Sequence, residues 1–195
     1  MNIVKVSTEH YRTVGDPLSA DVIVGFSYDQ SPDKLSAIDV ELGNLAVGFA
    51  NSGATAQNDS HGIPIIGDGA FVKSISFLER VSPSNVEQSG PRHAIEEVGL
   101  AAVGSAISRN LDIYTTLRGA KQYLADHDLS SPLFVAHARN IGQITRAAER
   151  LELGNIIIPP GLPDFFDGMA QQASRRTKFR WMMRNAIDRL LRRDE

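Results

Sequence analysis

Short apolar runs alternate with amphipathic stretches along this chain. Four runs are rich in Val, Ile, Leu or Phe and are bounded by polar residues, glycine or proline: 22–26, 62–66, 132–136 and 155–158. Runs this short and this apolar are typical of strands that are buried on both faces of a parallel sheet. The pattern therefore predicts four buried strands.

Between these runs, apolar residues recur at steps of three and four, which predicts helices with one apolar stripe. The expected helices are 32–51, 71–78, 111–126 and 141–151. Ser31 is the expected cap of the first helix, and 51–53 its stop. Residues 82–93 are predicted to form a surface loop, and the Ala- and Gly-rich stretch 94–107 a helix.

Strands that alternate with helices of this length indicate βαβ units. The expected fold is a single Rossmann-like domain over 1–195, a three-layer α/β/α arrangement with a mainly parallel sheet. In such a sheet the ligand lies outside the carboxyl ends of the strands, near the point where strand order reverses. The loops of interest are 27–30, 67–69, 108–110, 137–143 and 159–163.

Composition removes several classes of function. The 195 residues include no cysteine, which excludes disulfide scaffolds, iron–sulfur centres and cysteine nucleophiles. The five histidines have no helical metal-binding spacing, so we expect no zinc site formed by neighbouring residues. The glycine-rich fingerprints of NAD and ATP sites and the serine-hydrolase elbow are absent from the sequence.

Charge is unevenly distributed. Residues 171–195 hold 8 of the 20 basic residues and 3 of the 23 acidic ones, so this tail is +5 and the remainder is −8. The tail is predicted to be an amphipathic helix. A docked terminal helix with a solvated basic face is favoured over a membrane-surface helix or a nucleic-acid arm. With no targeting segment or membrane span in view, we expect a cytoplasmic protein without a membrane or nucleic-acid partner.

The exit of the second predicted strand carries the first candidate group. Gly67 and Gly69 are expected to offer backbone N–H groups to an anion, although a tight turn needs the same residues. Asp68 between them is a candidate general base or ribose-hydroxyl ligand, with a solvated turn aspartate as the alternative.

The exit of the third predicted strand carries the second group. His137 is a candidate proton carrier or phosphate contact, assisted by Arg139, and the alternative is a half-exposed loop histidine. Ser108 and Asn110 precede the helix over 111–126 and are most simply its caps.

The order of segments resembles the YdcF/SanA/ElyC-like family, bacterial proteins of largely unsettled function with a Rossmann-like sheet. Three segments carry the resemblance: 21–25 as the strand opening, 108–111 as a Ser-x-Asn turn before a helix, and 135–144 as a strand that runs into a helix. The chain departs from the family at Asn140, where the family has His, and at Gln143, where it has Arg.

The resemblance implies a soluble relative of proteins of which one binds S-adenosylmethionine and others maintain the cell envelope. The leading hypothesis is a protein that binds a small anionic, nucleotide-type or S-adenosylmethionine-type molecule, without assigned catalysis. The expected ligand-binding residues are Ser27, Gly67, Gly69, Ser108, Asn110, Arg139, Asn140 and Gln143.

Two rival hypotheses remain open. One is a hydrolase or transferase that acts on a phosphate- or sugar-containing metabolite, with His137 or Asp68 as general acid or base. The other is an interaction module that uses the basic tail. Ligand identity and oligomeric state do not follow from the sequence.

Overall fold

The computed structural model describes residues 11–28, 35–57, 62–81, 95–97, 113–167 and Met182. Its sheet has four strands in the order β3-β2-β1-β4, and all neighbours are parallel. The strands are β1 (Val22–Gly25), β2 (Ile65–Gly67), β3 (Ile95–Glu97) and β4 (Pro132–Val135). The expectation of parallel apolar strands is therefore confirmed for β1, β2 and β4.

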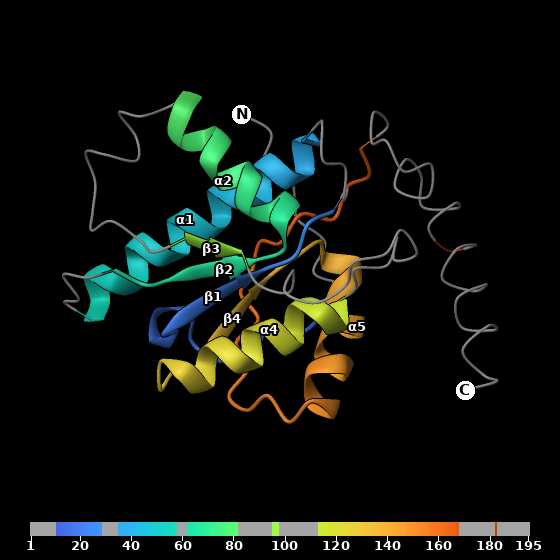
Figure 1. Ribbon diagram of the computed structural model, residues 1–195. Coiled ribbons are helices and arrows are strands. Elements are labelled where there is room, and N and C mark those ends of the chain that lie inside the picture. Colours follow the sequence, from blue (N-terminus) through green and yellow to red (C-terminus); the bar gives the residue numbers. More distant parts are fainter. Residues whose placement is uncertain are drawn as a thin grey trace, which may run out of the picture.

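Helices cover both faces of this sheet (Figure 1). They are α1 (Ala37–Gln57), α2 (Gly69–Val81), α4 (Ile113–Asp126) and α5 (Ala138–Arg150), and a short 3-10 helix, η1 (Pro17–Ser19), precedes β1. Helices α1 and α2 pack together on one face, and α4 and α5 on the other. The Rossmann-like α/β class expected from the sequence is the fold observed.

The helices on both faces of the sheet explain why the strands are so apolar. Strands β1, β2 and β4 are buried at every residue, because helices shield both faces of the sheet. The ring of Phe26, just after β1, meets the ring of Phe134 in β4 edge to face at 5.7 Å. Burying an aromatic or branched aliphatic side chain of this kind contributes about 1.5–3 kcal/mol, so this central pair anchors the core.

The last predicted strand extends the sheet beside β4. Ile157 exchanges backbone hydrogen bonds with Pro132 and Phe134 in parallel orientation, at 2.9 Å each. On its other side, Ile158 pairs with Val14 in antiparallel orientation. These contacts are isolated bridges, so the run 155–158 lies where a fifth strand would be without forming a regular ladder.

Helix α1 differs from the predicted span of 32–51. It begins at Ala37 and continues past the expected glycine stop to Gln57. Gly53 lies buried inside the helix, where an added Cβ would come within 2.4 Å of the Ile63 side chain. This glycine provides space for packing rather than a helix end.

The stretch 94–107 contains a second correction. Its composition favoured a helix, but Ile95–Glu97 form β3, in register with β2 from Ile65 to Gly67. Pairing with an available sheet edge outweighs a weak local helix preference. The rest of 82–107 lies outside the described residues, as does the basic tail 171–195 apart from Met182.

No helix in the described part of the chain has both the length and the apolar character needed to cross a bilayer.

Two strand glycines make room for one aromatic ring. Gly25 and Gly67 are partners across β1 and β2. A Cβ added at Gly25 would lie 1.9 Å from Phe71 Cε1, and one at Gly67 would lie 2.6 Å from Phe71 Cδ1. The fully buried Phe71 ring therefore occupies the space that these two positions leave empty.

We predict that Gly25→Ala destabilises the fold by about 1–3 kcal/mol, because the added methyl group overlaps the Phe71 ring. Gly48→Ala is the control, since a Cβ there meets nothing within 4 Å. In the helix interior this change stabilises by about 0.5–1 kcal/mol. Urea denaturation measures both, and equal stabilities for the two variants would contradict the packing role of Gly25.

Candidate functional site

The candidate site lies at the carboxyl edge of the sheet, where β1 and β4 end side by side. Strands β1, β2 and β3 follow one another outward in one direction, and the chain then returns to place β4 on the other side of β1. This reversal is the position at which open α/β sheets bind ligands. The residues that follow β1, β2 and β4 therefore share one edge: 26–28, 68–69 and 136–139.

Two carboxyl groups hold the backbone where β1 leaves the sheet. The Ser27 N–H donates to Asp68 Oδ2 at 2.7 Å, and the Tyr28 N–H donates to Asp39 Oδ1 at 2.6 Å. Asp68 follows β2, and Asp39 lies in the first turn of α1. Consecutive N–H groups that have left the β-ladder thus find acceptors on two different elements.

Asp39 is fully buried and belongs to a capping box at the start of α1. The Ser36 hydroxyl donates to Asp39 Oδ2 at 2.6 Å, and the Asp39 N–H donates to Ser36 Oγ at 3.0 Å. This reciprocal pair replaces the expected cap at Ser31. The Ser-x-x-Asp spacing of 36–39 is a signal in the sequence that identifies this start.

Asp68 is the N-cap of α2. Its Oδ1 accepts the N–H groups of Ala70 and Phe71, at 3.1 and 3.0 Å. With Ser27, three backbone donors therefore reach this carboxyl group, so it is neither a solvated turn residue nor an unengaged base. Burial raises the pKa of Asp68 above its ordinary value of 3.8, while the N–H donors of Ser27 and Phe71 partly oppose that rise.

The hydroxyl of Ser27 is the exception in this arrangement. Ser27 is 6% exposed, and within the described chain its Oγ is buried without a hydrogen-bond partner. It lies close enough to Asp68 to lower the pKa of that carboxyl group, yet without hydrogen-bond geometry. A buried hydroxyl without a partner costs free energy, so its presence at this edge requires an explanation.

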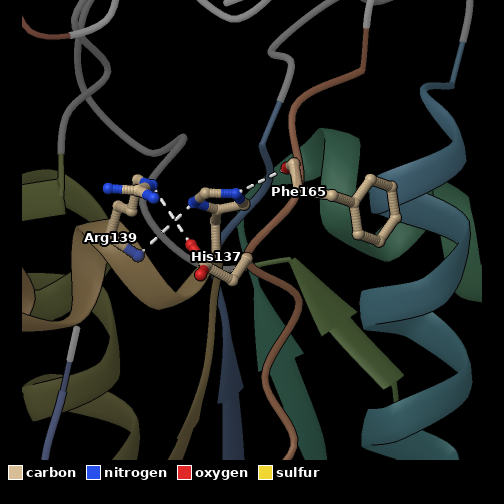
Figure 2. Close-up of polar contacts among 4 residues, drawn as sticks. His137, Arg139 and Phe165 are labelled. Carbon is tan, nitrogen blue, oxygen red and sulfur yellow. Dashed lines mark hydrogen bonds and ion pairs between the residues drawn. The ribbon is translucent and has the colours of Figure 1, made fainter. Parts of the chain in front are cut away.

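His137 is fully buried, not half-exposed, and caps α5. Its Nε2 lies 2.8 Å from the carbonyl oxygen of Phe165, and its Nδ1 accepts the Arg139 N–H at 3.4 Å (Figure 2). Because a carbonyl only accepts, the proton of the neutral ring lies on Nε2. Both ring nitrogens therefore have backbone partners, and the role of proton carrier stays a prediction.

Arg139 is held by the segment 162–167, which we call the return segment. Its Nε lies 3.1 Å from Asp164 Oδ1, and its guanidinium lies 5.3 Å from the centre of the Phe166 ring. The Phe166 ring also lies 5.6 Å from the His137 ring. The Phe165 ring points away from His137 (Figure 2) and is 48% exposed.

The return segment also reaches the start of α1. Asp167 Oδ2 accepts the Ala37 N–H at 3.1 Å, a contact between residues 130 positions apart. At the start of the segment, Leu162 donates its N–H to the Tyr11 hydroxyl at 3.0 Å. Through these contacts the segment is fixed to the starts of α5 and α1 and to Tyr11.

The structure brings most of the predicted site residues to one edge. Ser27, Asp68 and Gly69 meet at the exits of β1 and β2, while Arg139 and the buried Asn140 begin α5. The glycine at 67 lies within β2 and is accounted for by the Phe71 ring. Gln143 is one turn further along α5 and partly exposed, and Ser108 and Asn110 lie outside the described residues.

Sequence reasoning missed four acidic and aromatic residues that complete the edge: Asp39, Asp164, Phe166 and Asp167. Tyr28 lies in the loop of interest 27–30 but was not an expected site residue. Asp39 has a local signal, the Ser-x-x-Asp box. Asp164, Phe166 and Asp167 are identified by contacts between distant segments, for which the chain offers no spacing rule. Asp164 lies one residue beyond the loop of interest 159–163.

The comparisons with known protein families, curated proteins and solved structures each find no match to this chain. In the described ranges, no group of three or more histidine or carboxylate residues is arranged to hold a metal ion.

We predict that Asp39→Asn destabilises the protein by about 1–3 kcal/mol, because the new amide NH₂ faces a buried N–H or O–H donor and leaves it without an acceptor. Asp126→Asn is the control, because Asp126 is exposed and its carboxyl group accepts a hydrogen bond from the exposed Gln122 side chain. It should change stability by less than about 0.5 kcal/mol. Thermal and urea unfolding compare the two, and a harmless Asp39→Asn would contradict the capping role.

We further predict that the Asp68 carboxyl titrates above 3.8 in the folded protein. The folded state then binds this proton more tightly than the unfolded chain. Asp68 therefore makes the free energy of unfolding fall as pH rises from 3.8 through the folded pKa. Carbon-detected NMR gives the midpoint, and unfolding of Asp68→Asn shows whether that slope disappears. A midpoint at or below 3.8 would refute the effect of burial.

Proposed function

We propose that this chain binds a small nucleotide- or S-adenosylmethionine-type molecule at the carboxyl edge, between the exits of β1 and β4. The observation that carries the proposal is the Ser27 hydroxyl, which is buried and has no hydrogen-bond partner among the described residues. A bound molecule that supplies a donor or acceptor there would remove the cost of that unmet group.

The position of Ser27 supports the same conclusion. It lies two residues beyond β1, the strand beside which the sheet reverses its order. Ligands of doubly wound sheets bind at this reversal because the loops on either side turn in opposite directions and leave a crevice. The neighbouring carboxyl group of Asp68 adds a second polar group at the same point.

The resemblance of 21–25, 108–111 and 135–144 to YdcF-like proteins adds S-adenosylmethionine to the ligands that deserve a test. Of the two rival hypotheses, acid–base catalysis would use His137 or Asp68, and both of these side chains are helix caps. The basic tail of the other rival lies outside the described residues. Binding without assigned catalysis is therefore the function proposed.

We predict saturable binding of S-adenosylmethionine or a nucleoside in calorimetry, and a loss of about 2–10-fold in affinity for Ser27→Ala, the value of one hydrogen bond. The same variant should unfold no earlier than wild type without ligand, because it lacks the unmet hydroxyl. A variant that binds the ligand more weakly but is at least as stable as wild type indicates a ligand-binding role for Ser27. A purely structural role would lower its stability instead.

Ser52→Ala is the matched control for this experiment. Its hydroxyl is exposed on α1 and donates to the Gly48 carbonyl at 2.9 Å, away from the edge. Its affinity should equal that of wild type. The proposal fails if no ligand of this class binds at millimolar concentration, or if Ser27→Ala binds as tightly as the control.

A further inference from the structure

Phe165 is a large aromatic side chain that stays exposed beside the candidate site. It lies in the return segment and is 48% exposed, and among the described residues its ring contacts no other aromatic side chain. Phe166 differs, because its ring packs against His137 and Arg139. Of two consecutive phenylalanines, one therefore attaches the segment to the protein and the other presents its ring to solvent.

The backbone of Phe165 is fixed although its ring is exposed. The Phe165 carbonyl oxygen lies 2.8 Å from Nε2 of the buried His137. Two residues further on, Asp167 accepts the Ala37 N–H at 3.1 Å. The segment is thus held to α5 and to α1 on either side of the exposed ring. A ligand that contacts this ring has little chain to order, which lowers the entropic cost of binding.

The ring also belongs to the part of the edge where Ser27 lies. Tyr28, the next residue, places its ring 4.8 Å from the ring of His137, the residue that contacts the Phe165 carbonyl. The Tyr28 N–H donates to Asp39 in the first turn of α1, to which the return segment is also bound. The Phe165 ring points away from His137, toward the α1 side of the site (Figure 2). Ser27 and Phe165 therefore share their neighbours on α1 and α5.

Exposure alone would not distinguish this residue, since single apolar side chains are common on protein surfaces. Val14 and Leu18 are exposed to a similar degree, 45% and 44%. Leu18 lies in η1, before β1 begins and so at the amino end of that strand, and Val14 pairs with Ile158 at the border of the sheet. Phe165 differs from both in being aromatic and in lying at the carboxyl edge.

We propose that Phe165 is the stacking residue of the site, and that its ring packs against the planar base of the ligand while Ser27 binds a polar group of the same molecule. Every nucleobase has a π face, and proteins commonly hold bases by stacking them on aromatic side chains. The inference rests on the proposed function. It adds that the aromatic base is the part of the ligand that the return segment recognises.

The test is calorimetry with adenosine and S-adenosylmethionine on wild type, three variants of Phe165 and the control Leu18→Ala. Phe165→Ala should lose about 5–150-fold in affinity, the range for one base stacked on one aromatic ring. Phe165→Tyr keeps the aromatic face and should stay within about threefold of wild type. Phe165→Leu is apolar but not planar and should lose at least about fivefold. Leu18→Ala should bind like wild type.

The comparison of Phe165→Tyr with Phe165→Leu separates stacking from a structural role. His137 contacts the carbonyl group of residue 165 and not its ring, so every variant keeps the groups of that contact. Urea midpoints should agree between Phe165→Ala and Leu18→Ala, because both remove an exposed side chain. If Phe165→Ala unfolds more easily, Phe165→Tyr and Phe165→Leu decide, since both fill the position and only one of them can stack.

The outcomes also separate this inference from the proposed function. Affinity of Phe165→Ala or Phe165→Leu equal to that of Leu18→Ala overturns the inference, and the proposed function stands if Ser27→Ala still binds more weakly than wild type. Loss of binding in Phe165→Tyr as large as that in Phe165→Leu overturns the inference as well. If neither compound binds wild type at millimolar concentration, both the proposed function and this inference fail.

Discussion

Where β1 leaves the sheet, its backbone N–H groups lose the neighbouring strands that satisfied them, and the burial of this region denies them water. Buried N–H groups without acceptors are too costly to be left in a folded chain. Here Asp68 and Asp39 supply the acceptors, and each is also tied to the start of a helix. The positions of α1 and α2 relative to β1 depend on these two carboxyl groups, as does the shape of the edge between β1 and β4.

At the start of α5, too, a backbone N–H group needs an acceptor, and here a histidine side chain supplies it in place of a carboxyl group. A histidine ring caps the helix there and contacts the return segment through Nε2, so the backbone of residues 162–167 is held against the edge. Arg139 and Phe166 add an ion pair and a ring contact to that attachment. The caps at this edge therefore depend on one another. Among the described residues, the Ser27 hydroxyl differs from these caps, because it is buried without a hydrogen-bond partner.

The sequence predicts the fold well because its main signal is local. Short apolar runs must be buried on both faces, so β1, β2 and β4 and the helical stripes between them follow from spacing alone. The two wrong predictions of secondary structure have physical causes. Ile95–Glu97 form a strand because β2 offers an open edge. Helix α1 continues through Gly53 because the Ile63 side chain occupies the space that a side chain at position 53 would fill.

The candidate site is less predictable than the fold. The strand pattern identifies the loops after β1, β2 and β4, and with them Ser27, Asp68 and Arg139. It does not identify their partners, because Asp164 and Asp167 reach the edge through a reversal of the chain that leaves no periodic pattern in the sequence. Glycine is also an ambiguous signal in the sequence. A glycine at position 67 is expected for a tight turn or an anion site, but in the structure Gly67 makes room for the Phe71 ring.

The pairing of Val14 with Ile158 has a consequence for how the molecule meets its neighbours. The segment beside β4 would otherwise present unpaired backbone groups outward, the arrangement through which folded proteins recruit strands from other chains. One antiparallel bridge to Val14 covers it, and Pro159 and Pro160 follow directly, with no N–H to offer. The bridge and the prolines therefore oppose the pairing of a strand from another chain with residues 158–160.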